Sequence, residues 1–216
     1  VCVGADPDRI AILDNFCWGN CAKPDRLGSL VLAAQACHDG ALAYGTPFIS
    51  GKDSLNNEFV TEDGETIAIP PTLLISGIGI VPDVTRCVTM DAKRAGNALA
   101  LVGVTQDGLA ASHYLQVAGI GEEKTVPAVD LDLGPRTARA VAGAIADGLV
   151  RSAHDPSEGG LAVALAEMCL AGGLGLSAEL PIQAHPLSDG AALFGESPSR
   201  YLLEVEPDKL DALRNA

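Results

Sequence analysis

The sequence is short of positive charge. It has 14 Lys and Arg residues against 28 Asp and Glu residues, which gives a formal net charge of −14 at pH 7. A protein that binds nucleic acid usually presents a basic face, so this balance argues against a nucleic-acid partner. Nucleotides are not excluded, because backbone amides, one or two lysines and metal ions are enough to hold phosphates.

Long hydrophobic runs are also missing. No apolar run approaches the roughly 20 residues that cross a membrane, and the first residues show no basic segment followed by the apolar stretch of a signal peptide. We therefore expect no membrane partner and a cytoplasmic location. The sequence begins with VCVG and has no initiating Met, which suggests a piece of a longer protein.

Paired cysteines are absent as well. The six cysteines include no Cys-x-x-Cys pair, and Cys17 and Cys21 lie four positions apart with no second pair to complete a metal site. Scattered thiols of this kind fit a reducing cytoplasm, where they are more often buried or idle than metal-bound or catalytic.

What is present is enough apolar sequence for a core. Hydrophobic residues make up 48% of the 216 positions, which is typical of a globular protein. Strands and helices alternate in the hydrophobic pattern, and this indicates an α/β or mixed α+β fold. Composition changes after residue 82, and we expect a domain boundary near Asp91. The expected strands cover residues 9–13, 47–49, 72–81, 98–104, 150–154 and 201–205, and the expected helices cover 25–44, 135–148, 155–171 and a last one from Pro207.

The segment SGKDSLNNEF (residues 50–59) has the highest density of functional side chains. We expect a turn here, directly after a strand. Gly51 would let the backbone approach a phosphate closely, and Lys52 would supply a point charge for phosphate oxygens. The pattern is not a Walker loop, because the second glycine and its spacing are missing. The alternative is a polar surface loop whose Asn and Asp residues cap turns.

Three other side chains of this segment suit metal or substrate binding. Asp53 and Glu58 are carboxylates that could hold Mg²⁺, and the hydroxyl of Ser54 could form a hydrogen bond with a substrate.

A second candidate is Asp14, in DNFCWGN (residues 14–20). A carboxylate at the carboxyl end of a buried strand is a common ligand position in α/β proteins. The alternative is an Asx turn that ends the strand, with Trp18 packed on the core.

The third candidate is HDPSEGGL (residues 154–161). Asp155 fits the N-cap of a helix, Pro156 fits its first position, and Glu158 completes a capping box. The N-terminus of a helix also binds anions. A structural role and a ligand-binding role are therefore compatible here.

Taken together and in this order, LDNFCWGN (13–20), SGKDSLNNEF (50–59) and AHDPSEGGLAVALAEM (153–168) resemble the second half of phosphoribosylformylglycinamidine synthase. The resemblance continues through SGIGIVPDVTRCVTMDAKRAGNALALVG (76–103), GLAASHYLQVAG (108–119) and LFGESPSRYLLEV (193–205), so it covers nearly the whole sequence.

The resemblance implies a fold of the aminoimidazole ribonucleotide synthetase-like superfamily. Members combine an N-terminal-type domain, whose mixed sheet pairs with another copy, and a C-terminal-type α/β domain. Phosphoribosylformylglycinamidine synthase contains two such domain pairs in one chain. Residues 1–90 would then be a partial second N-type domain, and residues 91–216 a partial second C-type domain.

The resemblance also implies an activity in de novo purine biosynthesis. The family is an ATP-dependent ligase that joins formylglycinamide ribonucleotide and ammonia into formylglycinamidine ribonucleotide, with release of ADP and phosphate. ATP and Mg²⁺ would be its cofactors. The implied partners are a glutaminase subunit or domain that supplies ammonia, and the first domain pair of the same enzyme. Since that pair supplies half of the active site, we expect the 216 residues alone to be inactive.

Two alternatives stay open at this point. One is a related ATP-dependent synthetase of the same superfamily. The other is a nucleotide-binding structural module without catalysis.

Some site residues follow from matching positions in the resemblance. Asp14 and Gly51 match residues that contact ATP, and Ser54 matches one that contacts substrate. Lys52 stands where many members have a metal-binding Asn. A protonated Lys cannot ligate Mg²⁺, so Lys52 would instead meet a phosphate of ATP.

The third candidate segment, HDPSEGGL, contributes two further positions. Asp155 and Ser157 match residues that hold metal and nucleotide at a second, structural ADP-binding site. Asp155 is therefore expected to bind both the nucleotide and the metal. No residue is assigned as the catalytic acid, base or nucleophile.

Overall fold

The structure is a computed structural model that describes residues 1–120, 125–180 and 187–216. The chain divides into two compact units, which are described separately. The smaller unit consists of residues 7–80, and the larger unit consists of residues 1–6 and 81–216. The boundary expected near Asp91 falls inside the larger unit, and the assignment of family domains to the two parts stays a prediction.

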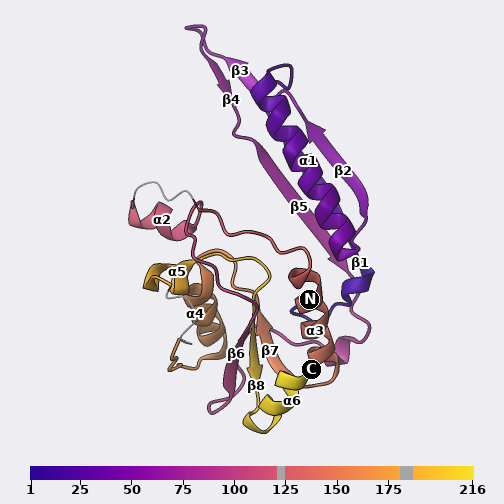
Figure 1. Cartoon of the computed structure of the whole chain (residues 1–216), viewed down its shortest axis with the longest axis vertical. Helices are drawn as coiled ribbons and strands as arrows, with labels where there is room; N and C mark the ends of the chain where they lie inside the picture. Colours follow the sequence, from indigo (N-terminus) through magenta and orange to yellow (C-terminus); the bar gives the residue numbers. More distant parts are fainter. Residues whose placement is uncertain (121–124, 181–186) are drawn as a thin grey trace. The chain divides into compact units, whose positions relative to one another are not determined.

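The smaller unit is a three-stranded sheet with one long helix against it (Figure 1). Its central strand is parallel to one neighbour and antiparallel to the other, and the helix connects the two parallel strands. A separate hairpin follows, with its turn at residues 61–65. The elements are η1 (Pro7–Arg9), β1 (Ile10–Cys17), α1 (Pro24–Tyr44), β2 (Phe48–Ser54), β3 (Glu58–Val60), β4 (Thr66–Ala68) and β5 (Thr72–Gly79), with sheet order β2-β1-β5.

Two of the expected loops are strands, and those expectations were wrong. We expected the first strand to end before Asp14 and the SGKDS segment to form a turn. Instead β1 continues to Cys17 and β2 to Ser54, with Asp14 beside Gly51 and Phe16 beside Asp53. Main-chain pairing between neighbouring strands outweighs the low strand propensity of Asp, Asn and Gly, which is a weak and context-dependent preference.

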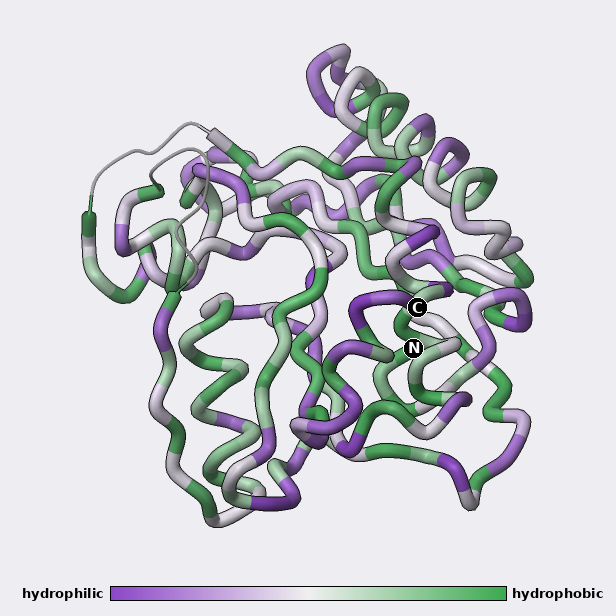
Figure 2. Tube along the Cα trace, turned by 60° about the horizontal axis from the view of Figure 1, so that its bottom comes forward, coloured by the Kyte–Doolittle hydropathy of each residue, from purple (hydrophilic) through white to green (hydrophobic). Residues whose placement is uncertain are grey.

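Helix α1 contacts the sheet in its first turns through Trp18. The indole Nε1 of Trp18 donates a hydrogen bond to Ser29 Oγ (2.9 Å), and the Trp18 ring lies 5.4 Å from that of Phe16. The helix begins at Pro24, one residue before the expected start at Asp25, with Lys23 at its N-cap position. Figure 2 shows green and purple residues interleaved along α1, the long coil at the upper right.

The larger unit has a sheet covered on both faces. Strand β8 lies at its centre and is antiparallel to both neighbours, in the order β6-β8-β7. Helices α3 and α4 pack on opposite faces. The elements are η2 (Val84–Arg86), β6 (Ala98–Val102), α2 (His113–Ala118), α3 (Leu133–Ala146), β7 (Val150–His154), α4 (Gly160–Gly172), α5 (Asp189–Phe194), β8 (Tyr201–Val205), η3 (Pro207–Lys209) and α6 (Leu210–Asn215).

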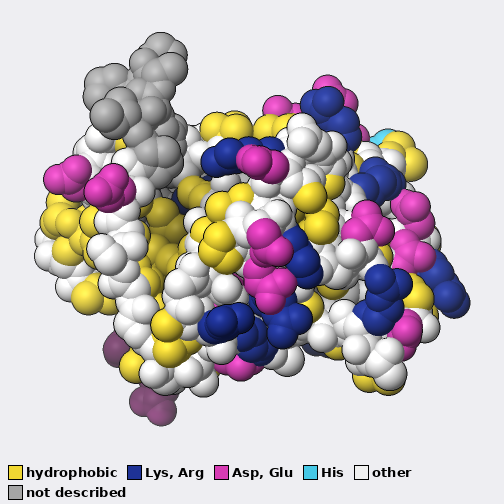
Figure 3. Space-filling view, turned by 90° about the horizontal axis from the view of Figure 1, so that it is seen from below, with side chains coloured by type: hydrophobic (Ala, Val, Ile, Leu, Met, Phe, Trp, Pro, Cys, Tyr) yellow, Lys and Arg dark blue, Asp and Glu magenta, His cyan; other side chains and the backbone are white. Residues whose placement is uncertain are grey.

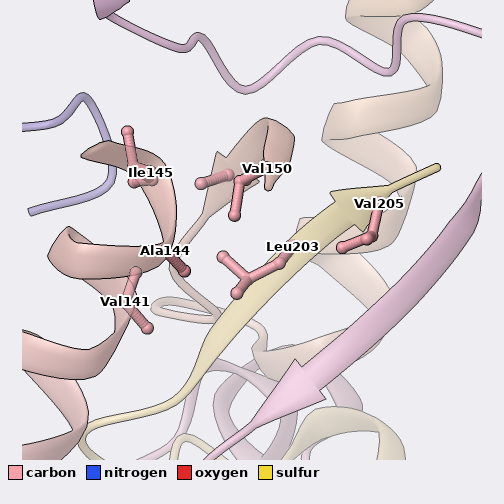
Figure 4. Close-up of a cluster of buried hydrophobic side chains, with 7 residues drawn as sticks. Val141, Ala144, Ile145, Val150, Leu203 and Val205 are labelled. Atoms are coloured by element: carbon pink, nitrogen blue, oxygen red, sulfur yellow. The ribbon is translucent and has the colours of Figure 1, made fainter. Parts of the chain in front are cut away.

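Two hydrophobic clusters define these faces. Since successive side chains of a strand point to opposite faces, Leu203 and its neighbour Leu202 belong to different clusters. The first joins α3, β7 and β8, and Figure 4 shows its side chains converging between these elements. It consists of Val141, Ala144, Ile145, Val150, Ala153, Leu203 and Val205. The second joins α4 and β8 and consists of Leu161, Ala164, Met168 and Leu202.

The mixed α/β fold expected from the sequence is confirmed. The strands expected at residues 150–154 and 201–205 have the same bounds in the structure. Within the parts of the chain that the structure describes, no helix combines the length and the apolar character needed to span a membrane.

Candidate functional site

Asp14 lies on the face of the smaller sheet that carries α1. Burial raises the pKa of the Cys37 thiol on that helix, and the negative charge of Asp14 raises it further. The backbone N–H of Lys52 donates to Asp14 Oδ1 (3.3 Å). A Cβ at Gly51 would lie only 2.4 Å from the same oxygen. The glycine therefore makes room for the Asp14 carboxylate, whereas the sequence had suggested room for a phosphate.

Lys52 and Ser54 lie on the opposite face of this sheet. They alternate with Gly51 along β2, and their partners on β1 are Asn15 and Cys17. The Lys52 ammonium donates a hydrogen bond to Ser54 Oγ. The structure thus groups Lys52 with Ser54 and places Asp14 on the other side of the sheet, so the expected ATP-binding residues do not share one surface.

Two of the three expected metal ligands, Asp53 and Glu58, lie in the smaller unit and differ in their surroundings. Asp53 pairs with Phe16 on β1 and so faces the same side as Asp14. Two carboxylates on one side are the kind of oxygen ligands that Mg²⁺ uses together with water and phosphate oxygens.

Glu58 is already bonded within the protein. It accepts the N–H of Asn20 (3.1 Å) and pairs with Lys23 Nζ (3.1 and 3.2 Å). These bonds hold its pKa below the ordinary value. Glu58 therefore fits a structural role better than a metal site. Among the described residues, no group of three or more His, Cys, Asp and Glu is arranged to hold a metal ion.

The Asp155 motif is a turn and not the first turn of a helix. Helix α4 begins at Gly160 with Gly159 as its N-cap, so the capping box expected from Asp155 and Glu158 does not form. Gly159 and Gly160 have φ angles of 77° and 66°, which a glycine adopts without strain. A Cβ at Gly160 would lie 2.6 Å from the Gly195 carbonyl oxygen, so close packing requires a glycine there.

Asp155 and Ser157 come together within this turn. Ser157 Oγ donates to Asp155 Oδ2 (2.8 Å), and His154 Nδ1 lies 3.6 Å from Asp155 Oδ1. Cys2 Sγ lies 3.9 Å from the same oxygen. Burial, and then the Asp155 charge, raise the pKa of Cys2 to about 11. The exposed Asp155 and Ser157 present oxygens that a metal ion or a nucleotide hydroxyl could contact.

Glu196 occupies the N-terminus of α4, and sequence reasoning missed it. Its Oε1 accepts the N–H of Gly159 (2.8 Å) and of His113 (2.9 Å), and lies 3.2 Å from His113 Nδ1. Burial alone would raise the pKa of Glu196, but these hydrogen bonds outweigh it and lower the pKa. The sequence predicted an anion site at a helix N-terminus beginning at Asp155, whereas the amide of the actual N-cap, Gly159, binds a carboxylate of the protein. Glu196 lies in the segment LFGESPSR, and no sequence pattern there indicates its role.

A fully buried carboxylate, Glu204, connects the chain before β6 to the sheet through hydrogen bonds. It accepts hydrogen bonds from Lys93 N (2.7 Å), Arg94 N (3.0 Å), Asn97 Nδ2 (2.7 Å) and Ser152 Oγ (2.8 Å). Burial would raise its pKa, but the four donors lower it. Glu204 is satisfied within the protein, which is the requirement for burying a charge.

One apolar hollow of the larger unit is lined by neither Asp155 nor Ser157. A cavity of about 500 Å³ opens beside α4 and β6, with Leu99, Leu101, Leu161 and Leu165 in its wall. None of the residues predicted to bind a ligand lines it. Figure 3 shows basic and acidic side chains interspersed over one face of the molecule.

The fold of the larger unit agrees with the family whose model matches the chain. Residues 94–216 match the C-terminal domain of AIR synthase related proteins, and the chain belongs to this family.

Within it, the chain is a homologue of phosphoribosylformylglycinamidine synthase, as the motif resemblance indicated. It is 42% identical over 210 residues to phosphoribosylformylglycinamidine synthase subunit PurL of Deinococcus radiodurans, a match that covers 95% of the chain. The chain spans only 28% of that relative's length.

Solved structures show the same fold. The chain aligns with T. maritima PurL complexed with ATP at a TM-score of 0.65 and 19% identity, over 99% of the chain and 32% of that structure. The alignment with T. maritima PurL complexed with FGAR has a TM-score of 0.67 and 19% identity, over 98% of the chain and 33% of that structure.

Proposed function

We propose that the chain is part of an ATP-dependent ligase that converts formylglycinamide ribonucleotide and ammonia to formylglycinamidine ribonucleotide, ADP and phosphate. The observation that carries this proposal is the order of the three motifs, combined with the match to PurL over 95% of the chain. In this reaction ATP phosphorylates the amide oxygen of the substrate, and ammonia then displaces phosphate.

Each motif has a proposed part in this chemistry. Asp14 and Asp53, on one face of the smaller sheet, would hold Mg²⁺ and the ATP that it carries. Ser54 would contact the ribonucleotide substrate. Phosphoryl transfer depends mainly on position and on charge stabilisation, so metal and lysine charges matter more than a covalent catalyst.

The Asp155 turn would serve a separate nucleotide. Asp155 and Ser157 would hold metal and ADP at a structural site on the larger unit. The bond between Ser157 Oγ and Asp155 Oδ2 keeps the two side chains together. This arrangement is compatible with the alternative of a purely structural nucleotide module, and also with a related synthetase of the same superfamily.

The partners follow from the same proposal. Ammonia would come from a glutaminase subunit or domain, and the remaining half of the active site from a first domain pair. Formylglycinamide ribonucleotide is the proposed substrate, ATP and Mg²⁺ the proposed cofactors, and the cytoplasm the proposed location. We therefore expect the isolated 216 residues to be inactive, and amidine formation by this chain alone would contradict that expectation.

Calorimetric titration of ATP and then ADP, with and without Mg²⁺, tests the two sites. We expect Mg²⁺-dependent ATP binding to be lost in Asp14→Asn and ADP binding to be lost in Asp155→Asn. Asp63→Asn, in the hairpin turn between β3 and β4, is a matched control that removes a carboxylate from neither site. Binding that survives Asp14→Asn but not Asp155→Asn would favour the structural module over the ligase.

A further inference from the structure

Ser54, the residue proposed to contact the substrate, lies where β2 ends and a loop begins. Its partner across the sheet is Cys17, the last residue of β1. Loops are more mobile than the strands they connect, so the position of Ser54 depends on what holds the residues after it. Those residues are 55–57, and the loop that follows β1 is residues 18–23, here called the β1–α1 loop.

The two loops stay hydrogen-bonded to each other beyond the ends of the strands. The Trp18 N–H donates to the Ser54 carbonyl oxygen (2.8 Å), and the Asn57 N–H donates to the Trp18 carbonyl oxygen (2.8 Å). Asn57 Nδ2 donates to the same Ser54 oxygen (3.4 Å). The Cys21 N–H donates to the Leu55 carbonyl oxygen (3.3 Å). The main chain around Ser54 is therefore held by the loop after β1.

Glu58, the first residue of β3, bonds to the β1–α1 loop. Its Oε2 accepts the N–H of Asn20 (3.1 Å), and Lys23 Nζ donates to Oε1 (3.1 Å) and Oε2 (3.2 Å). Lys23 is the N-cap residue of α1, so one carboxylate joins the loop to the start of the helix. Gly19 makes room for it, since a Cβ there would lie 3.3 Å from Glu58 Oε2.

The alternative for Glu58 is an ordinary surface ion pair, which contributes little. The Glu58 side chain is only 13% exposed, whereas that of Lys23 is 44% exposed. One of its bonds also goes to a main-chain amide, that of Asn20. An amide shielded from water needs an acceptor, and the carboxylate supplies it. These contacts favour a role in holding the loop.

We propose that Glu58, paired with Lys23, is a positioning residue that holds the β1–α1 loop in the conformation that fixes Ser54 at the end of β2. This role differs from the metal binding that the sequence predicted for Glu58. The inference rests on the proposed function only for the statement that Ser54 contacts the substrate.

NMR relaxation of the backbone amides of the 216-residue chain, without ligand, tests the proposal. Glu58→Gln removes the charge and one of the two acceptor oxygens. We expect the order parameters of the Leu55 and Asn57 amides to fall from about 0.85, typical of a rigid backbone, to about 0.6 in this variant. The Ile12 amide, which donates to the Pro47 carbonyl oxygen away from the loops, should keep its value.

Two further variants complete this measurement. Lys23→Met should lower the same order parameters by a smaller amount, because the bond between Glu58 and Asn20 remains. It also decides the case in which Glu58→Gln does not fold, since the Lys23 side chain is largely exposed. Glu62→Gln is the matched control, because it removes an exposed carboxylate from the hairpin turn and should change nothing.

A role in overall stability alone would lower the free energy of unfolding but leave the order parameters of the folded chain unchanged. Unchanged order parameters of Leu55 and Asn57 in both Glu58→Gln and Lys23→Met would therefore overturn the proposal. An equal fall at Ile12 would overturn it as well, because the effect would then not be confined to the loops.

Calorimetric titration of formylglycinamide ribonucleotide connects the loop to the proposed function. Ser54→Ala and Glu58→Gln should each weaken binding about fivefold. The double variant should be no weaker than Ser54→Ala, because Glu58 acts through Ser54, and additive losses would overturn this link. Absence of binding by the unchanged chain would count against the proposed function and leave the relaxation result, which uses no ligand, as it is.

Discussion

The two units of the chain bury their hydrophobic residues to very different degrees. In the larger unit, both faces of the sheet are covered by helices, and side chains such as Leu203 and Met168 are fully buried. In the smaller unit, only Phe16, Trp18 and Gly19 are buried, although all of its residues are described. Its open sheet face leaves Leu74 59% exposed and Ile78 57% exposed. Removal of apolar area from water is the main source of folding stability. The smaller unit therefore has less intrinsic stability than the larger unit.

This difference separates the two candidate sites as well. The Asp155 turn belongs to a unit with a complete core. Close to this turn, Glu196 from another segment accepts a hydrogen bond from the Gly159 amide. Asp14, Lys52 and Ser54 lie on a sheet whose open face is apolar and uncovered. An exposed apolar face of this kind marks a surface that another protein surface covers. We propose that the N-type domain of the first domain pair has this role, in line with the proposed shared active site.

The largest expected contrast is between two Leu→Ala substitutions. Leu203→Ala removes a side chain that is 1% exposed and should cost about 2–5 kcal/mol. Leu74→Ala, on the open face, should change stability by about 0.5 kcal/mol or less. Urea unfolding monitored by circular dichroism measures the effect of Leu203→Ala. Trp18 is the single Trp of the sequence, so its fluorescence reports on the smaller unit alone. A shift of the Trp18 transition by Leu203→Ala would show that the two units unfold together.

The next effect concerns the buried carboxylate of the larger unit. Glu204→Gln replaces a charged acceptor of four hydrogen bonds and should cost about 2 kcal/mol at neutral pH. Glu58→Gln is the matched change in the smaller unit and should cost less, since the Glu58 pair with Lys23 is partly exposed and screened by water. Chemical denaturation at pH 7 compares the two variants.

The same carboxylate predicts a dependence on pH. The folded pKa of Glu204 lies below its ordinary value of about 4.3, so the unfolded chain binds more protons between these two values. The stabilisation is fully present above this window and is lost as the pH falls through the folded pKa. Gln does not titrate, so Glu204→Gln should lose less stability on acidification than the unchanged chain. An equal acid-induced loss in both would contradict the assignment.

A smaller effect tests the packing of Asp14 inside the smaller unit. Gly51→Ala places a methyl group against the Asp14 carboxylate and should cost about 1–3 kcal/mol. Gly28→Ala, in open space on α1, should instead stabilise the unit by about 0.5–1 kcal/mol. Both are measured by Trp18 fluorescence during unfolding. The double variant Asp14→Ala/Gly51→Ala should recover most of the Gly51→Ala loss, and simple additivity would contradict the proposed clash.

The smallest effect tests how residues 1–6 pack on the larger unit. The pKa of Cys2 is raised to about 11, first by burial and second by the negative charge of Asp155. Asp155→Asn should therefore lower this pKa only part of the way to the ordinary value. The pH dependence of Cys2 alkylation measures the shift, with the exposed Cys87 as an internal control. Ordinary reactivity of Cys2 in the unchanged chain would show that this segment does not pack as described.

Much of the fold could be predicted from local patterns. The strands at residues 150–154 and 201–205 are short apolar runs between turn residues, and their bounds followed from the hydrophobic pattern. The polar strands could not be predicted in this way. Asp14 and Asn15 favour turns locally, and only the pairing of β1 with β2 makes them part of a strand. In the same way, Asp155 has the sequence of an N-cap, but the packing of Gly160 against Gly195 moves the helix start to Gly160.

The sequence by itself determined the family, the motif order and the residue types available for chemistry, because these depend only on which side chains occur and in what order. Tertiary structure alone decided which of them meet. It placed Lys52 with Ser54 and away from Asp14, because successive side chains of one strand point to opposite faces. It also brought Glu196 to the N-terminus of α4, 37 residues from Gly159 in sequence, because buried amide groups must be paired wherever a partner can reach them.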